Sequence, residues 1–262
     1  MAKHLLSFDL RADFACFKKP DVNDGIILTF NCLHKPALLG ILGAIVGLKG
    51  YAKKGEFPEY YEVFKDLRIG IEPLEGYHDK GNFSKTIVKY TNTVGYANAD
   101  GTLIVTEQTL VKPAYRCYVM LDDSIEHQAT LRQRILNCES VYLPYLGKNE
   151  FSAWWEKESV KEYSFSEITQ IDSSYEVSSL FIKQFSVSEN REQEDREDFN
   201  FLDMSIPKEV FVFFERLPKK FDEKLYQYEL EKFSYTNVNI KASKVLHSLY
   251  FLEETKKYVQ LF

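Results

Sequence analysis

The spacing of apolar residues changes along the first fifty positions, from a strand pattern to a helix pattern. In residues 3–17 apolar side chains recur at every second position, as at Leu6, Phe8 and Leu10, which predicts a long strand with a bulge near Ala12. Residues 36–47 are apolar nearly all round, with Pro36 suited to the first helical position and Gly47 to the helix end. A helix with this pattern must be buried.

The glycines of this predicted helix have a structural interpretation. Gly40 and Gly43 each cost roughly 1 kcal/mol relative to alanine inside a helix, so their presence indicates that another backbone passes close by. They do not form a nucleotide-binding loop, because neither GxxxxGK[ST] nor a GxGxxG after a strand is present. The N-terminus of this helix has two possible interpretations. Lys35 and the free backbone N–H groups could bind a phosphate, or Lys35 is an ordinary surface lysine.

The rest of the first 150 residues predicts further strands and helices. Pro58 begins a second helix, and residues 69–73 form a strand. Residues 83–96 and 102–111 are two β-branched segments around a turn at Asp100 and Gly101, which predicts a long hairpin. A strand over 113–121, a helix over 122–137 capped by Asp123 or Ser124, and a last strand over 140–147 follow.

This order of elements predicts an α+β fold of the ferredoxin-like kind. Without the hairpin, the elements read strand, helix, strand, strand, helix, strand, which is the βαββαβ pattern of ferredoxin-like domains. We therefore expect one such domain over residues 1–150, with the hairpin inserted at about 76–112. The aromatic, alternating segments of residues 151–262 predict a smaller β-rich C-terminal region.

Charge and cysteine content narrow the function. The net charge of −6 argues against a free-standing nucleic-acid binder, but residues 1–148 hold 18 lysines and arginines against 17 acidic residues, while the rest is strongly acidic. Any bound RNA should therefore contact the N-terminal part. The four cysteines form no CxxC pair, which indicates buried free thiols and no metal site. No signal peptide or apolar run of membrane-spanning length is present, so we expect a cytoplasmic protein.

Four segments in order resemble a known family. HLLSFDLRADFACFKKP, LTF, HKPALLGILGAIVGL and YLPYLG together resemble the Cas-five family of CRISPR-associated proteins, the RAMP-type subunit of type I Cascade complexes, and most closely its subtype I-B branch. The resemblance covers residues 1 to about 150 and consists of shape and apolar pattern, without catalytic side chains. It implies that the hairpin is a thumb reaching over the crRNA 5′ handle toward a neighbouring backbone subunit.

The resemblance also implies the partners and the RNA-contacting positions. The partners would be the crRNA 5′ handle, the Cascade backbone subunit and the large subunit, with target DNA reached only through the complex, and neither a membrane nor a cofactor is implied. Gly147 permits a positive-φ turn that either serves RNA or simply closes a strand. The RNA-binding candidates share a basic, aromatic or turn-forming character: Arg11, Lys18, Lys19, Lys35, Lys85, Lys89, Tyr90, Arg116, Gly147 and Lys148.

Two other functions remain as alternatives. The subtype I-C branch of the family cuts repeat RNA without a metal, which needs a histidine base supported by lysine or tyrosine. His34 and His78 are the histidines nearest the predicted RNA-binding segments, but the tyrosine, lysine and histidine set of the cutting branch cannot be matched onto this chain residue by residue, so no catalytic residue is assigned. A ferredoxin-like regulator would instead bind a small molecule in an apolar pocket. Binding of RNA without cleavage is the favoured interpretation.

Overall fold

A five-stranded antiparallel sheet forms the centre of the molecule. The computed structural model describes residues 3–20, 25–92, 103–185, 199–205 and 209–262. The sheet has the order β10-β1-β8-β3, and β9 also pairs with β1. The bounds of these strands are β1 Lys3–Ala12, β3 Ile69–Pro73, β8 Ala114–Asp122, β9 Ala153–Trp154 and β10 Lys161–Tyr163.

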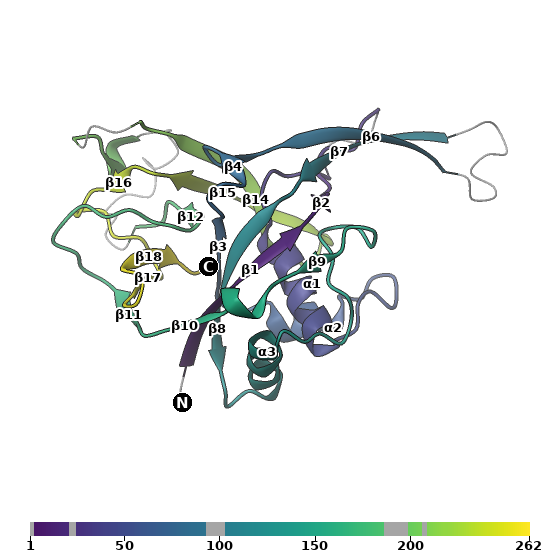
Figure 1. The fold of residues 1–262 in the computed structure, drawn as a ribbon, viewed down its shortest axis with the longest axis horizontal. Coiled ribbons are helices and arrows are strands. Elements are labelled where there is room, and N and C mark those ends of the chain that lie inside the picture. The colour runs from purple at the N-terminus through teal and green to yellow at the C-terminus, as the bar shows by residue number, and fades with distance from the viewer. Residues whose placement is uncertain (1–2, 21–24, 93–102, 186–198, 206–208) are drawn as a thin grey trace.

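The alternation of side chains along β1 and β8 separates two apolar cores. Leu6, Phe8 and Leu10 are fully buried on the side of the sheet that packs against the helices, as the period of two predicted. Tyr118 and Met120 point to the opposite side, where they are buried in a smaller core. The C-terminal strands β17 and β18 supply the other half of that core, so both faces of the sheet are covered within the described residues (Figure 1).

The last strand of the central sheet is not the one that the sequence predicted. Residues 140–147 are loop, with only one isolated bridge between Tyr145 and Ser152. Their place beside β1 is taken by β10, and the register pairs Leu5 with Tyr163. The prediction of a strand at 140–147 was wrong because its aromatic and β-branched residues are largely exposed, for example Val141 and Tyr142.

Helix α1 (Lys35–Val46) matches the predicted helix closely. The His34 side chain caps its N-terminus, and Gly47 ends it in the left-handed conformation with φ of 88°. The close neighbour expected at the glycines is α2 (Glu59–Phe64): a Cβ atom on Gly43 would lie 2.3 Å from the Tyr60 Cβ. Gly43 therefore lets the two helices approach.

Helix α3 (Glu126–Asn137) begins later than the sequence indicated. Its N-cap residue is Ile125, whereas Asp122 accepts hydrogen bonds from Ser124 in the turn before the helix. The predicted caps Asp123 and Ser124 are thus wrong. Leu131 and Ile135 bury one side of α3 against the core. Cys16, Cys32 and Cys117 are buried free thiols as expected, while Cys138 at the end of α3 is exposed.

The predicted hairpin is present as a long arm, which is called the thumb below. It consists of β6 (Lys85–Asn92) and β7 (Leu103–Val111), and β7 also pairs with the short strand β2 (Phe14–Ala15). Figure 1 shows the two strands leaving the body of the protein together. The predicted turn at Asp100 and Gly101 lies outside the described residues. A small pair, β4 (His78–Asp79) with β5 (Asn82–Phe83), stands at the base of the arm.

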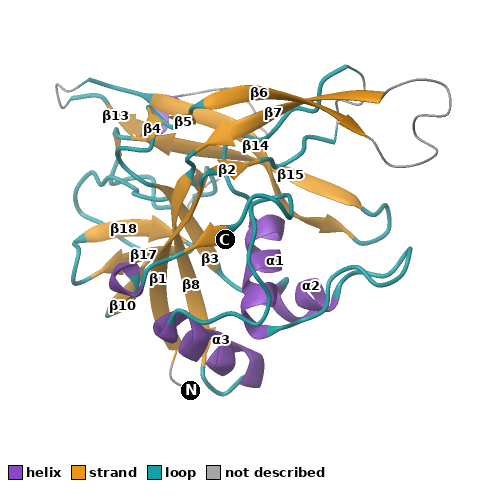
Figure 2. Ribbon diagram, turned by 45° about the vertical axis from the view of Figure 1, so that its right-hand side comes forward, coloured by secondary structure: helices purple, strands orange, loops and turns teal. Residues whose placement is uncertain are grey.

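Residues after 150 form short sheets that pack onto the first half. The strands are β11 Phe165–Ile168, β12 Phe181–Ile182, β13 Leu202–Asp203, β14 Val212–Asp222, β15 Gln227–Thr236, β16 Asn239–Ile240, β17 Leu249–Leu252 and β18 Lys257–Gln260. The hairpin β14–β15 runs beside the thumb strands, above α1 (Figure 2). Leu217 and Phe233 from this hairpin share the main core with Leu38 and Leu42 of α1. The first-half core is therefore completed by the C-terminal region.

Candidate nucleic-acid interface

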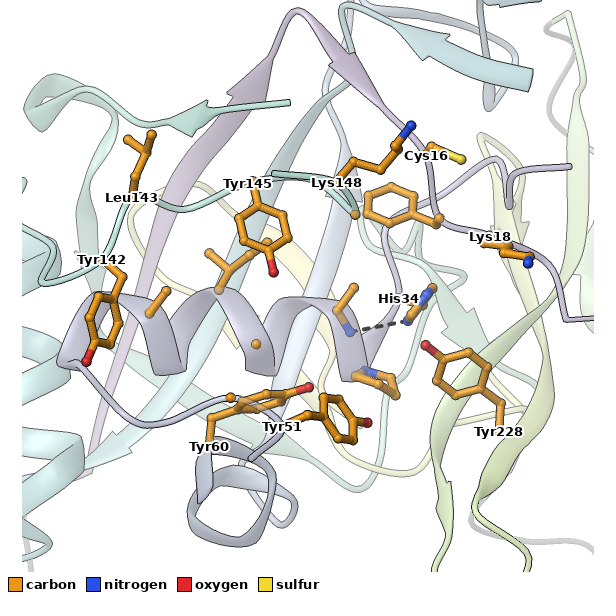
Figure 3. Close-up of a pocket in the computed structure, with 18 of the residues that line it drawn as sticks. Cys16, Lys18, His34, Tyr51, Tyr60, Tyr142, Leu143, Tyr145, Lys148 and Tyr228 are labelled. Atoms are coloured by element: carbon orange, nitrogen blue, oxygen red, sulfur yellow. Dashed lines mark hydrogen bonds between the residues drawn. The ribbon is translucent and has the colours of Figure 1, made fainter. Parts of the chain in front are cut away.

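A groove of about 940 Å³ runs along the outward side of α1. Its floor includes Ala37, Gly40 and Ala44, which follow one another at helical spacing and are only partly buried. Because these side chains are so small, the helix backbone forms the bottom of the groove. Figure 3 shows tyrosines standing on both sides of the helix above this floor.

Tyrosine side chains supply most of the groove's aromatic surface. Loop 139–147 contributes one wall, which is tied to the end of α1 because the Tyr142 N–H donates to the Ala44 carbonyl over 3.0 Å. The opposite side comes from α2, the loop before it and β15. The tyrosines lining the groove are Tyr51, Tyr60, Tyr90, Tyr142, Tyr145 and Tyr228. Tyr51 is 64% exposed and Tyr145 is 43% exposed, so their rings are open to a ligand.

A charged pair closes the thumb end of the groove. The Lys148 ammonium lies 3.1 Å from both carboxylate oxygens of Glu107, which is itself only 3% exposed on β7. The same ammonium lies 4.8 Å from the Tyr90 ring centre and 5.5 Å from that of Phe151. Lys148 is thus neutralised and fixed in place. Lys18 and Lys49 are the other lysines that line the groove, and both are exposed.

Gly147 holds this end of the groove together through a close backbone approach. Its φ of 86° favours glycine, and an added Cβ would lie 1.9 Å from the carbonyl oxygen of Cys16. The neighbouring Leu146 carbonyl accepts a hydrogen bond of 3.2 Å from the Cys16 N–H. The turn therefore fastens loop 139–147 to the segment that follows β2.

His34 stands at the other end of the groove floor as a neutral helix cap. Its Nδ1 accepts a hydrogen bond of 3.3 Å from the Ala37 N–H, and the ring packs against Phe17, Phe30 and Tyr228. Burial lowers the pKa of His34 from 6.5 to about 3. At neutral pH this side chain is uncharged, and its Nδ1 already has a donor.

His34 should make the protein less stable in mild acid. Between its folded pKa of about 3 and its unfolded value of 6.5 the unfolded chain binds more protons, so the free energy of unfolding falls as the pH drops through this interval. The loss is about 1.4 kcal/mol per pH unit, or about 2 kcal/mol between pH 6.5 and pH 5. Urea unfolding at several pH values measures it.

His34→Asn is the matched control for this pH dependence. Asparagine is among the best N-cap residues but does not titrate, so the variant keeps the cap and loses the slope that His34 causes. Burial raises the pKa of Glu215, which acts in the opposite direction in both proteins and cancels in the comparison. Equal slopes for the two proteins would show that His34 is not buried in its neutral form.

The structure brings together only part of the predicted RNA-binding set. Lys18, Tyr90, Gly147 and Lys148 all line the groove. Lys35 does not, because it is 7% exposed and its ammonium donates to the Phe262 carbonyl over 3.1 Å. Burial lowers the pKa of Lys35 to about 8. The phosphate site expected at Lys35 is therefore not formed in this structure.

Lys19 and Lys85 belong to a polar network beneath the thumb. Lys19 pairs with Glu215 at 3.2 Å, and the Lys85 ammonium donates to the Asn31 Oδ1 over 2.6 Å. Asn31 also contacts Gly81, as its Nδ2 donates to that carbonyl over 2.7 Å. These two lysines thus have partners within the protein, whereas Lys89 is exposed on β6.

The two arginines of the predicted set lie on the central sheet instead. Arg116 makes a bidentate pair with Asp9, with distances of 2.8 and 3.0 Å, and Arg11 approaches the same carboxylate at 3.8 Å. Neither lines the groove. The face of the sheet that carries Arg116 is covered by β17 and β18, which bury Tyr118 and Tyr163. Bases therefore cannot stack on this face.

The sequence did not single out most groove tyrosines. Tyr60, Tyr142, Tyr145 and Tyr228 come from three distant segments, and no local motif distinguished any of them. Tyr51 gave the better signal, because it is followed by Lys53 and Lys54 in a glycine-containing loop. Among the described residues, no cluster of three or more His, Cys, Asp or Glu side chains could hold a metal. No described helix is long and apolar enough to cross a membrane.

Comparison with known proteins gives matches among solved structures only. No family model matches the sequence, and no curated protein matches it. A chain of a CRISPR RNA-guided surveillance complex is 12% identical, with 91% of this chain and 92% of that chain covered and a TM-score of 0.45. A CRISPR protein from Archaeoglobus fulgidus is 13% identical, with 97% of each chain covered and a TM-score of 0.43.

A third similar structure belongs to a larger RNA-bound assembly. It is a chain of the Type III-B Cmr-beta complex bound to cognate target RNA and AMPPnP, 9% identical, with 99% of each chain covered and a TM-score of 0.48. These similar structures are thus CRISPR proteins or parts of CRISPR complexes. At TM-scores below 0.5 they carry no weight for the function of this chain, which must be inferred from its groove and its sequence motifs.

Proposed function

We propose that this protein is a non-catalytic RNA-binding subunit of a type I CRISPR Cascade effector, related to the Cas-five family, that caps the crRNA 5′ handle. One observation carries the proposal: the segments that resemble the family meet at the groove. Lys18 comes from the first segment, Ala37 to Ala44 from the glycine-containing helix, and Tyr142 to Tyr145 from YLPYLG. Segments about a hundred residues apart thus build one aromatic surface.

The central sheet fits the ferredoxin-like scaffold that the family implies. The order β10-β1-β8-β3, antiparallel throughout, with α1 between β1 and β3 and α3 between β8 and β10, corresponds to βαββαβ connectivity. The thumb strands β6 and β7 lie in the connection between β3 and β8. We therefore assign the scaffold as RAMP-like, with the last strand supplied by residues 161–163.

In the proposed mode, unpaired bases lie against the tyrosine rings and phosphates stay at the rim. Base stacking on an aromatic side chain is worth about 1–3 kcal/mol and tolerates any base. The exposed ammonium groups of Lys18 and Lys49 are placed for phosphates, whereas Lys148 is neutralised by Glu107. Binding should therefore depend on salt only weakly, in keeping with the net charge of −6.

The thumb supports an obligate place in an assembly. Ile87 is 49% exposed and Ile104 is 63% exposed on this two-stranded arm, and a hairpin with apolar side chains open to water is poorly stable without a partner. We assign the Cascade backbone subunit to the thumb and the large subunit as a further neighbour. Guide pairing would select target DNA, so no base reading of DNA is required of this chain.

The described histidines favour binding over cleavage. His34 is neutral, caps α1 and has a pKa of about 3, which makes it a very weak base at neutral pH. His78 accepts a hydrogen bond of 3.0 Å from the Gly81 N–H through its Nδ1. Within the described residues, neither imidazole forms a hydrogen bond with a lysine or tyrosine side chain, although tyrosine rings pack against both.

Purification of the chain from its host cells separates the candidate functions. The proposal predicts bound RNA of uniform length together with other subunits. Cleavage of repeat RNA by the chain alone would instead identify a nuclease. If neither RNA nor partner subunits accompany the protein, the proposal is wrong and a small-molecule regulator becomes the better candidate.

Removing two exposed groove rings should weaken RNA binding strongly. Tyr51→Ala combined with Tyr145→Ala deletes two stacking surfaces from opposite walls, so a loss of about 2 kcal/mol or more, roughly 30-fold in Kd, is expected for single-stranded RNA. Fluorescence anisotropy with an RNA bearing the repeat-derived handle measures it.

Trp154→Ala serves as the matched control for this variant. Trp154 is also an exposed aromatic residue, at 41%, but lies on β9 outside the groove lining. Its removal should leave RNA affinity within about twofold, since no stacking surface of the groove is lost. Equal losses for Trp154 and for the tyrosine pair would place the RNA elsewhere on the protein.

A further inference from the structure

Four of the tyrosines that line the groove, Tyr51, Tyr60, Tyr145 and Tyr228, flank the helix floor. The Tyr51 and Tyr60 side chains lie next to each other below α1 in Figure 3, and each phenol affects the pKa of the other. Burial is the main cause of the raised pKa of Tyr60, and the phenols of Tyr51, Tyr228 and Tyr145 raise it further. Figure 3 shows their side chains on both sides of the helix floor.

This part of the groove is polar but uncharged. Burial raises the pKa of Tyr228 to about 12, and that of Tyr60 is raised too, so both remain neutral phenols at physiological pH. The helix floor here consists of Ala37, Gly40 and Ala44, which carry no polar side chain. A phosphate seated among these phenols would lack a balancing positive charge, and burial without one is costly.

The chemistry of a phenol cluster matches a neutral hydroxyl. Each phenol can donate one hydrogen bond and also accept one, which is the same capacity that a ribose 2′-hydroxyl has. Because the faces of exposed tyrosine rings accept bases, the sugar of a stacked nucleotide lies at the ring edge, where the hydroxyl is. The 2′-hydroxyl is the group by which a protein distinguishes RNA from DNA at a given site.

We propose that the hydroxyls of Tyr51, Tyr60, Tyr145 and Tyr228 contact ribose 2′-hydroxyls and make the groove selective for RNA over DNA of the same sequence. This inference rests on the proposed function, since it assumes that a single-stranded nucleic acid occupies the groove. In this proposal the tyrosine hydroxyls determine the preference for RNA over DNA, and the tyrosine rings provide the affinity for both.

The test compares RNA and DNA on variants that lack only these oxygens. For the unmodified protein, one or two hydroxyl contacts predict that single-stranded RNA binds about 5- to 30-fold more tightly than DNA of the same sequence. Tyr60→Phe combined with Tyr228→Phe keeps both rings and should bring RNA affinity to within about threefold of DNA affinity. DNA affinity itself should be unchanged in this variant.

Tyr77→Phe is the matched control because Tyr77 is an exposed tyrosine, at 38%, that lies outside the groove lining. It should leave the RNA-to-DNA ratio as it was. If the double variant loses RNA and DNA affinity equally, the hydroxyls contact bases and the inference is wrong. If RNA and DNA bind the unmodified protein equally, the inference fails while the proposed function stands. If neither binds, the proposed function fails with it.

Discussion

Gly147→Ala should lower the free energy of unfolding by about 3 kcal/mol or more. Two effects combine at this position. The backbone has a φ of 86°, where a side chain costs roughly 1–2 kcal/mol, and the new Cβ would lie 1.9 Å from the Cys16 carbonyl oxygen. A backbone atom cannot rotate away as a side chain can, so the loop must shift, which typically costs a further 1–3 kcal/mol. Thermal or urea unfolding measures the total.

Gly76→Ala separates these two effects. Gly76 has a φ of 84°, nearly the same as Gly147, but an added Cβ there would meet no atom within 4 Å. This variant should therefore show only the conformational cost of roughly 1–2 kcal/mol. The shift would also move loop 139–147, which carries the groove residue Tyr145, so RNA affinity should fall for Gly147→Ala alone. If both alanine variants are equally stable, Gly147 does not approach Cys16 in solution.

Asn31→Ala is expected to destabilise the protein by about 2–5 kcal/mol. The Asn31 amide donates to the Gly81 carbonyl over 2.7 Å, and its Oδ1 accepts from the Phe83 N–H over 3.1 Å and from Lys85 over 2.6 Å. Alanine would leave the buried backbone groups without partners, and each such group costs about 1–3 kcal/mol. Because Gly81 to Lys85 form the base of the thumb, this arm should lose its fixed orientation.

Asn82→Ala provides the comparison for Asn31. Asn82 lies in the same turn region and is exposed, so the same change should alter stability by no more than about 0.5 kcal/mol. Hydrogen exchange of the β6 and β7 amides adds a local measurement, with faster exchange expected for Asn31→Ala only. Unchanged exchange at the thumb would mean that Asn31 stabilises the body of the protein without fixing the arm.

The elements that sequence reasoning located correctly are those with local signals. Helix α1 was predicted almost to the residue because Pro36 and Gly47 mark its ends through backbone geometry alone. Strand β8 also has a local signal, because the alternation of its side chains places Tyr115 and Tyr118 on opposite sides of the sheet. Loop 139–147 was mistaken for a strand because its apolar residues face a groove that other segments build.

The candidate site was harder to predict because its basic side chains pair with groups that are far away in the sequence. From the sequence alone Lys35 could be a phosphate ligand. In the structure its ammonium donates to the Phe262 carbonyl, which is 227 residues away in the sequence. Arg116 likewise has its partner on β1, as Asp9 faces it across the sheet. The sequence indicated that basic and aromatic residues would form the RNA-binding site. In the fold most of the predicted basic residues pair with other protein groups, so tyrosines form most of the exposed surface of the groove.

The position of β10 in the central sheet bears on how the chain folds during synthesis. When the ribosome has made the protein as far as Pro144, β1, β3 and β8 exist, but the strand that pairs with the outer side of β1 has not yet been translated. The outer edge of β1 is then open to pairing with other nascent chains. Completion of residues 153–163 closes this edge, because β9 and β10 then pair with β1.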